Sequence, residues 1–247
     1  MTTAAPSKVR HRPDILALAR GERTCRKCEG RLTTCGCALL KNWWRTYTRL
    51  VPKHDQHVFL ETLEPSTKSN LSLERQAEVI EMLRAEPDAS YAFFGPAGTS
   101  KTTFSVALLE DALFCNPTAC EEGLGDRQYI WRTSAKSLAD EHHAFTTGKQ
   151  VNGRYVPEPT VTRRKIVKRS QNGHVPRLFL EEIDKVVYTE FRANMLFELV
   201  DSIYETKGQL VFASNLSLAE FVALFPPSVG EPIARRIGET MNVYNFF

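Results

Sequence analysis

The 247-residue sequence lacks any run of about 18 apolar residues, which is the length that a helix needs to cross a membrane. Its first residues, MTTAAPSKVRHRPD, contain no apolar core of the kind that a secretory signal needs. With 13 glycines, 13 prolines and 42% hydrophobic residues, the composition excludes a fibrous or disordered chain. We therefore expect a cytoplasmic globular protein without a membrane partner, built from one large domain and an appendage.

Acidic residues are scarce at the start of the chain. Residues 1–53 hold 12 Lys or Arg but only three Asp or Glu, which gives this segment a net charge of +9. The remaining 194 residues hold 20 basic and 26 acidic residues, a net charge of −6. A basic arm on an acidic body favours a polyanion or an acidic protein as the partner of the arm, and a solvated tail that aids solubility is the alternative.

Cysteine is also scarce, but four of the six cysteines cluster in the basic arm with the spacing C-x2-C-x6-C-x-C. In a cytosolic chain, clustered cysteines hold a metal more often than they form disulfides. Four thiolates suit tetrahedral Zn²⁺, and a site filled by four protein ligands is structural rather than catalytic. We predict a structural zinc site, with free thiols or a redox pair as the alternative. Its ligands would be Cys25, Cys28, Cys35 and Cys37.

The segment after the cysteines, residues 38–50, has the sequence ALLKNWWRTYTRL and is predicted to form a short basic helix. Its aromatic side chains either cover the core of the zinc module or stack on bases or a partner. From about Asp55 the chain alternates between strand and helix patterns, as α/β domains do. We therefore expect an arm of residues 1–53 and an α/β domain of residues 54–247.

A glycine-containing loop follows the apolar run of residues 91–94 and precedes a helical run. It matches the phosphate-binding pattern G-x-x-x-x-G-K-[ST], except that Ser100 replaces the second glycine. Lys101 would neutralise the β- and γ-phosphates, and Thr102 would coordinate Mg²⁺. Ser100 would need a backbone conformation normally given to glycine, at a cost of about 1 kcal/mol. A plain glycine turn is the alternative. The predicted nucleotide-binding residues are Gly95, Pro96, Ala97, Gly98, Thr99, Ser100, Lys101, Thr102 and Thr103.

Two further apolar strands end in polar residues. Residues 177–180 lead into Glu181 and Glu182, of which we expect Glu181 on the metal side and Glu182 as the catalytic base. Such pairs usually begin with Asp, so Glu181 is a departure from the pattern. Residues 209–213 lead into Asn215, whose amide would sense the γ-phosphate or position water. Solvated acids and an ordinary helix cap are the alternatives.

The order and spacing of these segments resemble the bacterial helicase-loader and insertion-sequence ATPases of the AAA+ class, the DnaC and IstB-like family. The resemblance covers nearly the entire chain, from the cysteine cluster to the closing PIARRI of residues 232–237. It implies a P-loop NTPase fold, with a parallel sheet flanked by helices and no C-terminal lid domain. It also implies Mg²⁺-dependent hydrolysis of ATP.

The resemblance assigns roles to individual residues. Lys101 and Thr102 resemble the nucleotide and Mg²⁺ contacts, Glu181 and Glu182 the acidic pair, and Asn215 the first sensor. Arg236, with Arg235 second, resembles the arginine finger that reaches the γ-phosphate of a neighbouring subunit. A finger supplied in trans makes hydrolysis depend on a head-to-tail homo-oligomer, either a ring or a spiral. A pair of ordinary surface arginines is the alternative.

The basic segment TRRKIVKR, residues 162–169, contains no acid and lies where this family often carries its motif for contacting single strands. We expect a flexible loop that binds single-stranded DNA through salt-sensitive phosphate contacts, and a solvated loop is the alternative. Its basic residues are Arg163, Arg164, Lys165, Lys168 and Arg169.

The expected function is therefore an ATP-dependent DNA-replication protein that loads the replicative helicase onto single-stranded DNA, with the arm holding the helicase. One alternative is a transposition regulator of the same fold that coats duplex DNA and recruits a transposase. Another is a nucleotide-binding scaffold with slow turnover, which the departures at Ser100 and Glu181 favour.

Overall fold

The computed structural model describes residues 46–51, 53–56, 58–115, 130–147, 150–151, 154–155, 165–167 and 175–247. They fall into two compact units, each considered by itself. The first unit takes the described residues of Met1–Leu63 and Val106–Gln128, and the second takes those of Glu64–Ser105 and Tyr129–Phe247. The four cysteines of the predicted zinc site lie outside the described residues. The arm boundary near residue 54 stays a prediction.

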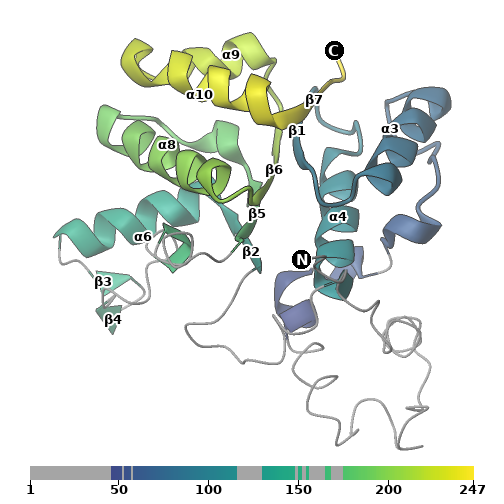
Figure 1. The fold of residues 1–247 in the computed structure, drawn as a ribbon, viewed down its shortest axis with the longest axis horizontal. Helices are drawn as coiled ribbons and strands as arrows, with labels where there is room; N and C mark the ends of the chain where they lie inside the picture. The colour runs from purple at the N-terminus through teal and green to yellow at the C-terminus, as the bar shows by residue number, and fades with distance from the viewer. Residues whose placement is uncertain are drawn as a thin grey trace, which may run out of the picture. The chain divides into compact units, whose positions relative to one another are not determined.

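Within the described residues, the second unit contains a five-stranded sheet in the order β2-β5-β6-β1-β7 (Figure 1). Neighbouring strands are parallel throughout, so the carboxyl ends of all these strands meet at one edge. Ligands of open parallel sheets bind at this edge, next to the point where the strand order reverses. The strands are β1 (Ser90–Phe94), β2 (Ile130–Ser134), β5 (Arg177–Glu181), β6 (Gln209–Ser214) and β7 (Met241–Asn245).

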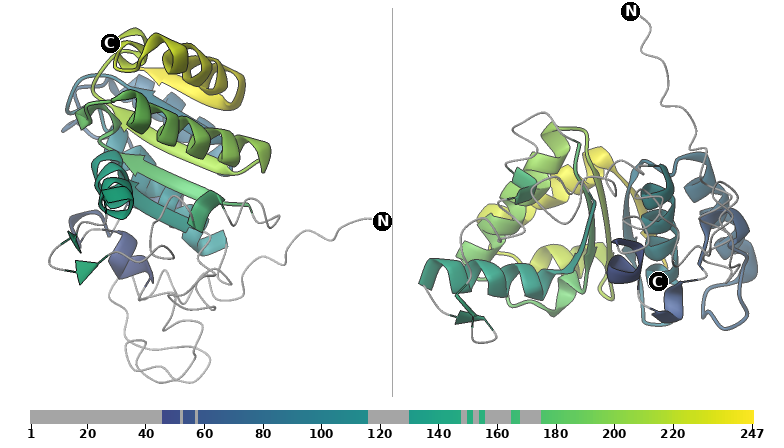
Figure 2. Two further views of the ribbon diagram at one scale, coloured as in Figure 1. Left: turned by 90° about the vertical axis from the view of Figure 1, so that its left-hand side faces the viewer. Right: turned by 90° about the horizontal axis from the view of Figure 1, so that it is seen from below.

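Helices cover both faces of this sheet (Figures 1 and 2). One face carries α6 (Ala135–Thr147), α8 (Glu190–Glu205), α9 (Leu218–Ala223) and α10 (Pro227–Thr240), and the other carries α3 (Leu73–Ala85). Helix α4 (Lys101–Cys115) begins directly after the loop that follows β1. A short hairpin of β3 (Gln150–Val151) and β4 (Arg154–Tyr155) follows α6, and the single turn η4 (Ile183–Lys185) follows β5.

The side chains of β1 alternate between two buried layers. Ala92 and Phe94 join the core that the sheet shares with α6, α8, α9 and α10. Tyr91 and Phe93 point to the other face, where Phe93 stacks on Tyr244 and Phe246. A strand buried on both faces has a nearly continuous apolar sequence, which explains why β1, β5 and β6 were predicted correctly.

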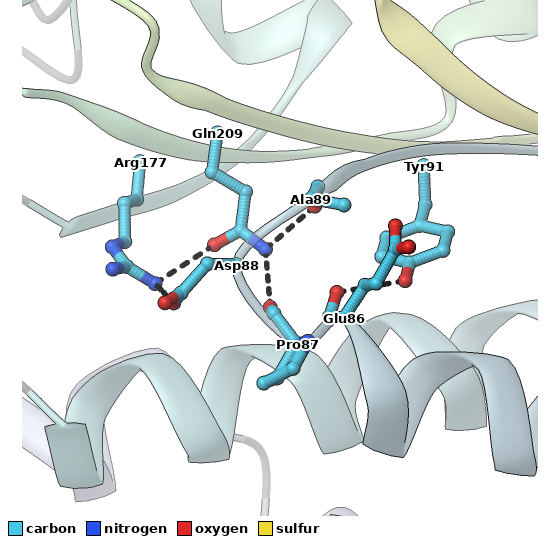
Figure 3. Close-up of polar contacts among 7 residues, drawn as sticks. All are labelled: Glu86, Pro87, Asp88, Ala89, Tyr91, Arg177 and Gln209. Atoms are coloured by element: carbon cyan, nitrogen blue, oxygen red, sulfur yellow. Dashed lines mark hydrogen bonds and ion pairs between the residues drawn. The ribbon is translucent and has the colours of Figure 1, made fainter.

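The amino ends of β1, β5 and β6 are joined by a polar network (Figure 3). The buried Gln209 amide donates hydrogen bonds to the carbonyls of Pro87 and Ala89, at 2.8 and 2.9 Å. Arg177 donates to the Gln209 side-chain oxygen at 3.3 Å and forms an ion pair with Asp88. A single buried side chain on β6 therefore satisfies groups from the two neighbouring segments, the one before β1 and the start of β5.

The first unit contains a helical turn at residues 46–50 and the short turns η1 (Lys53–Asp55) and η2 (Leu60–Thr62). The later part of α4, from Val106, belongs to the same unit. Residues 46–50 confirm the end of the basic helix predicted for residues 38–50. Tyr47 in this turn is fully buried, so it packs inside the unit and does not stack on an external base.

No helix in the described ranges is both long and apolar enough to cross a bilayer.

Candidate nucleotide-binding site

The loop between β1 and α4 depends on three unusual backbone conformations, with φ angles of 154° at Gly95, 85° at Gly98 and 62° at Ser100. A Cβ on Gly95 would lie 2.7 Å from the Cβ of Phe246, and one on Gly98 would lie 2.6 Å from Nδ2 of Asn70. Gly95 is therefore required by conformation and by space, whereas Gly98 is required by its conformation. Ser100 has the left-handed conformation that its alignment with a glycine position predicts.

The side chain of Lys101 is folded into this loop and is only 7% exposed. Its ammonium donates hydrogen bonds to the carbonyls of Gly95 and Pro96, both at 2.6 Å, and to the hydroxyl of Thr99 at 3.3 Å. Burial lowers the pKa of Lys101, and the nearby Asp184 carboxylate opposes that shift. Because a phosphate oxygen accepts a stronger hydrogen bond from an ammonium than a carbonyl does, a bound phosphate would compete for Lys101.

The tip of the loop is held by the segment that precedes α3. The backbone N–H of Asn70 donates to the Gly98 carbonyl at 2.9 Å, and its side-chain amide donates to the Ala97 carbonyl at 3.2 Å. The Ser69 hydroxyl also donates to the Gly98 carbonyl, at 3.2 Å. The sequence contains no local signal for these contacts, because about 27 residues separate the partners.

The two predicted acids at the end of β5 point to different partners. Glu181 pairs with Arg132 on the neighbouring strand β2, at 2.5 Å between carboxylate and guanidinium. Glu182 has a left-handed backbone with φ of 52°, and its half-exposed carboxylate pairs with Lys185. These ion pairs reduce the charge that either glutamate offers to a metal or to water, so the roles predicted for them stay predictions.

A third acid, Asp184, lies nearer to the rest of the site. Its Oδ2 atom accepts hydrogen bonds from both the backbone N–H and the side-chain amide of Asn215, at 3.2 and 3.1 Å. The carboxylate also acts electrostatically on Lys101. Asp184, which sequence reasoning missed, therefore hydrogen-bonds Asn215 and acts on the charge of Lys101. The available signal was the third acid in the run EEID at residues 181–184.

The oxygen-rich donor set fits Mg²⁺, which binds hydroxyl and carboxylate oxygens. The exposed Thr102 lies on the first turn of α4, and Glu181 stands at the end of β5. Asp184 adds a buried carboxylate oxygen, Oδ1, that makes no hydrogen bond within the described structure. In the described ranges, no group of three or more His, Cys, Asp or Glu side chains is arranged to hold a metal by itself.

The two arginines of α10 have different surroundings. The Arg236 guanidinium binds Asp201 on α8 at 2.8 Å and lies 4.2 Å above the ring of Tyr204. The side chain of Arg235 is 65% exposed, and its Nε atom lies 3.8 Å from the carboxylate of Glu239. Arg236, the first choice for an arginine finger, is thus engaged within its own chain, whereas Arg235 extends into solvent.

The predicted DNA-contacting segment is described only at residues 165–167, which form a helical turn. Lys165 is half-buried there, and Ile166 is fully buried in the core of the sheet domain. This part of the segment is therefore anchored, contrary to the expectation of a flexible loop throughout. The remaining predicted contacts, Arg163, Arg164, Lys168 and Arg169, lie outside the described residues.

The sheet order and the helical layers have counterparts among solved structures. The crystal structure of the DnaC helicase loader matches with a TM-score of 0.52 and 18% identity, over 79% of this chain and 99% of that chain. DnaA from Aquifex aeolicus bound to AMPPCP matches with a TM-score of 0.51 and 16% identity, over 80% of this chain and 51% of that chain. The parallel sheet and its flanking helices match those of AAA+ P-loop domains.

A replication initiator DnaA bound to AMPPCP and single-stranded DNA matches with a TM-score of 0.50 and 16% identity, over 80% of this chain and 50% of that chain. The chain thus spans about half the length of the DnaA structures and nearly all of the DnaC structure. No protein-family model and no curated protein matches the sequence. The predicted α/β fold with a parallel sheet flanked by helices is confirmed for the described residues.

Proposed function

We propose that this protein is an AAA+ ATPase that binds and hydrolyses ATP in DNA replication. The observation that carries the proposal is the loop after β1, in which glycines and a left-handed Ser100 surround the buried ammonium of Lys101. The likeness to DnaC and to DnaA structures that contain AMPPCP supports it.

Each step of the proposed reaction has a residue at the carboxyl edge of the sheet. Lys101 would leave the loop carbonyls and bind the β- and γ-phosphates, while the N–H groups at the start of α4 bind phosphate oxygens. Thr102 and Glu181 would hold Mg²⁺, which would offset the negative charge of the phosphates. Glu182 would orient or deprotonate the attacking water, and Asn215 would contact the γ-phosphate.

Completion of the site would require a second copy of the chain. An arginine that reaches the γ-phosphate of the neighbouring subunit must be free to extend from its own surface. The exposure of Arg235 and the internal contacts of Arg236 favour Arg235 for this role. A head-to-tail contact of this kind would build a ring or spiral, and hydrolysis would then depend on protein concentration.

Within replication, we propose that the protein loads the replicative helicase. The arm, stapled by zinc at Cys25, Cys28, Cys35 and Cys37, would hold the helicase, and the basic residues of 162–169 would hold single-stranded DNA. The match over nearly the full length of the DnaC helicase loader supports this assignment. The match to a DnaA structure containing single-stranded DNA supports the DNA contact.

A nucleotide-binding scaffold with slow turnover is the second candidate. It is favoured by the ion pair between Glu181 and Arg132, because a carboxylate held by a guanidinium is less available to a metal.

Steady-state ATP hydrolysis with and without single-stranded DNA separates the two candidates. We expect DNA-stimulated turnover in the wild type and background turnover in Lys101→Ala and Glu182→Gln. Lys136→Ala, which removes an exposed lysine on α6, is the matched control and should behave as the wild type. Equal rates of hydrolysis in the wild type and both site variants would exclude the ATPase. If those rates are equal but Lys101→Ala loses ATP binding, the nucleotide-binding scaffold is the remaining candidate.

Helicase loading needs a separate test in the native host. Because Tyr47 is buried inside the first unit, only residues 1–40 should be deleted and not the whole arm of residues 1–53. We expect the full chain to capture a hexameric helicase and the shortened chain to lose it. Equal capture by both chains would contradict the role of the arm.

A further inference from the structure

Three adjacent strands bring Asp184, Asn215 and Lys101 to one place. Asp184 follows β5, Asn215 follows β6 and Lys101 follows the loop after β1, and these strands are neighbours in the sheet. The central position of Asn215 puts it between the acid and the lysine in this order. The topology therefore places the three residues at the ends of adjacent strands, although more than a hundred residues separate Lys101 from Asn215 along the chain.

The position of Asp184 is set by a rigid turn. The left-handed Glu182 reverses the chain after β5, and the N–H of Lys185 donates to the Glu182 carbonyl at 3.0 Å. The next residue, Ile183, is buried, and its carbonyl accepts a hydrogen bond from the Tyr188 hydroxyl at 2.8 Å. Because both neighbours of Asp184 are fixed, its carboxylate has a defined direction.

The two oxygens of Asp184 are used differently. Oδ2 accepts hydrogen bonds from the backbone N–H and from one side-chain N–H of Asn215. These bonds restrain the side-chain amide and leave its other N–H and its oxygen to bind a ligand. Oδ1 is buried and makes no hydrogen bond in the described structure, although the carboxylate acts electrostatically on Lys101. A buried carboxylate oxygen without a hydrogen-bond donor lowers the stability of the fold. We therefore expect a donor to reach Oδ1 when a ligand is bound.

We propose that Asp184 is the positioning residue that sets the Asn215 amide and the Lys101 ammonium for the γ-phosphate of a bound nucleoside triphosphate. This inference rests on the proposed nucleotide site. When a phosphate displaces Lys101 from the carbonyls of Gly95 and Pro96, Oδ1 of Asp184 can accept a hydrogen bond from the lysine, next to Asn215. Asp184 thereby makes the lysine and the sensor amide respond to the same phosphate group.

The experiment compares binding of ATP and ADP by the full chain in the presence of Mg²⁺. In Asp184→Ala, ATP affinity should fall about tenfold, as expected for the loss of charge-assisted hydrogen bonds, while ADP affinity changes less than about twofold. Asn215→Ala should show the same selective loss, and the double variant should lose no more than either single variant. Asp184→Asn, which keeps an acceptor oxygen for Asn215, should retain part of the discrimination.

Melting temperature is measured for every variant, and Asp140→Ala, which removes an exposed acid on α6, is the matched control. Equal losses of ATP and ADP affinity in both Asp184 variants would mean a structural role and overturn the inference. A rise of ATP affinity in Asp184→Asn would mean simple repulsion of the triphosphate and also overturn it, as would additive losses in the double variant. Wild-type ATP affinity in Lys101→Ala would instead overturn the proposed nucleotide site, and this inference with it.

Discussion

The phenol of Tyr47 donates a hydrogen bond to the fully buried carboxylate of Glu110, with 2.5 Å between Oη and Oε1. Tyr47 lies in the predicted arm, whereas Glu110 lies on α4, and both belong to the first compact unit. The other carboxylate oxygen of Glu110 is buried without a hydrogen-bond partner in the described structure. Burial raises the pKa of Glu110 to about 8, the Tyr47 hydrogen bond lowers it, and Asp55 raises it.

This raised pKa predicts a pH-dependent stability. Between pH 4.5 and about pH 8 the folded chain keeps the Glu110 proton while the unfolded chain releases it, so the free energy of unfolding falls as pH rises. The contribution of this group is at most about 1.4 kcal/mol per pH unit and ends near the folded pKa. Urea unfolding at pH 5.5, 7 and 8.5 measures it. Glu110→Gln should flatten the slope, and Glu78→Gln on the exposed side of α3 should not. An unchanged slope in Glu110→Gln would contradict the assignment.

Ser100 should be a site of stored backbone strain. Ser100→Gly should raise the free energy of unfolding by about 1 kcal/mol, because glycine adopts a φ of 62° without a steric penalty. Ser100→Ala keeps the strain and removes only the hydroxyl, so it should match the wild type. Thermal unfolding of the three proteins tests the point, and equal stabilisation by Gly and Ala would show that the hydroxyl, not the backbone, is responsible.

Replacing each of the two arginines of α10 by alanine should have different effects on melting temperature and on ATP hydrolysis. Arg236→Ala should lower the melting temperature, because it leaves Asp201 without its guanidinium and removes the contact with Tyr204. Arg235→Ala should leave the melting temperature and ATP affinity unchanged but abolish the concentration-dependent part of ATP hydrolysis. The reverse pattern would return the finger role to Arg236.

Gln209 should be more important for stability than its polar character implies. Gln209→Ala removes the donor of two carbonyls and one of the two contacts of the Arg177 guanidinium, so the free energy of unfolding should fall by about 2–4 kcal/mol. Asn194→Ala, which removes an exposed amide on α8, should change stability by less than about 0.5 kcal/mol. A similar small effect for both in urea unfolding would show that water replaces the lost contacts.

The elements that the sequence revealed are those with local patterns. Strands β1, β5 and β6 are apolar runs that end in polar residues, and the loop after β1 carries its own spacing of glycine and lysine. Strand β7 was not predicted, because its sequence MNVYN is short and lies at the edge of the sheet, where only Met241 is buried and no apolar run marks the strand.

The contacts that escaped prediction depend on which segments become neighbours. Asp184 meets Asn215 only because β5 lies beside β6, and Arg236 meets Asp201 only because α10 packs on α8. Neither adjacency is encoded in the spacing along the chain. A role for Asp184 was therefore accessible only after the strand order was known, and the preference between Arg235 and Arg236 only after helix packing was known.

The contact between Gly95 and Phe246 holds the start of the phosphate loop more firmly than its tip. The N–H of Phe246 donates to the Phe94 carbonyl at 2.8 Å, and its side chain fills the space where a Cβ of residue 95 would lie. The start of the loop is thus fixed at the edge of the sheet, whereas its tip accepts hydrogen bonds from Ser69 and Asn70. A ligand that displaces the tip of the loop would therefore also displace the segment before α3, while Gly95 stays in place against Phe246.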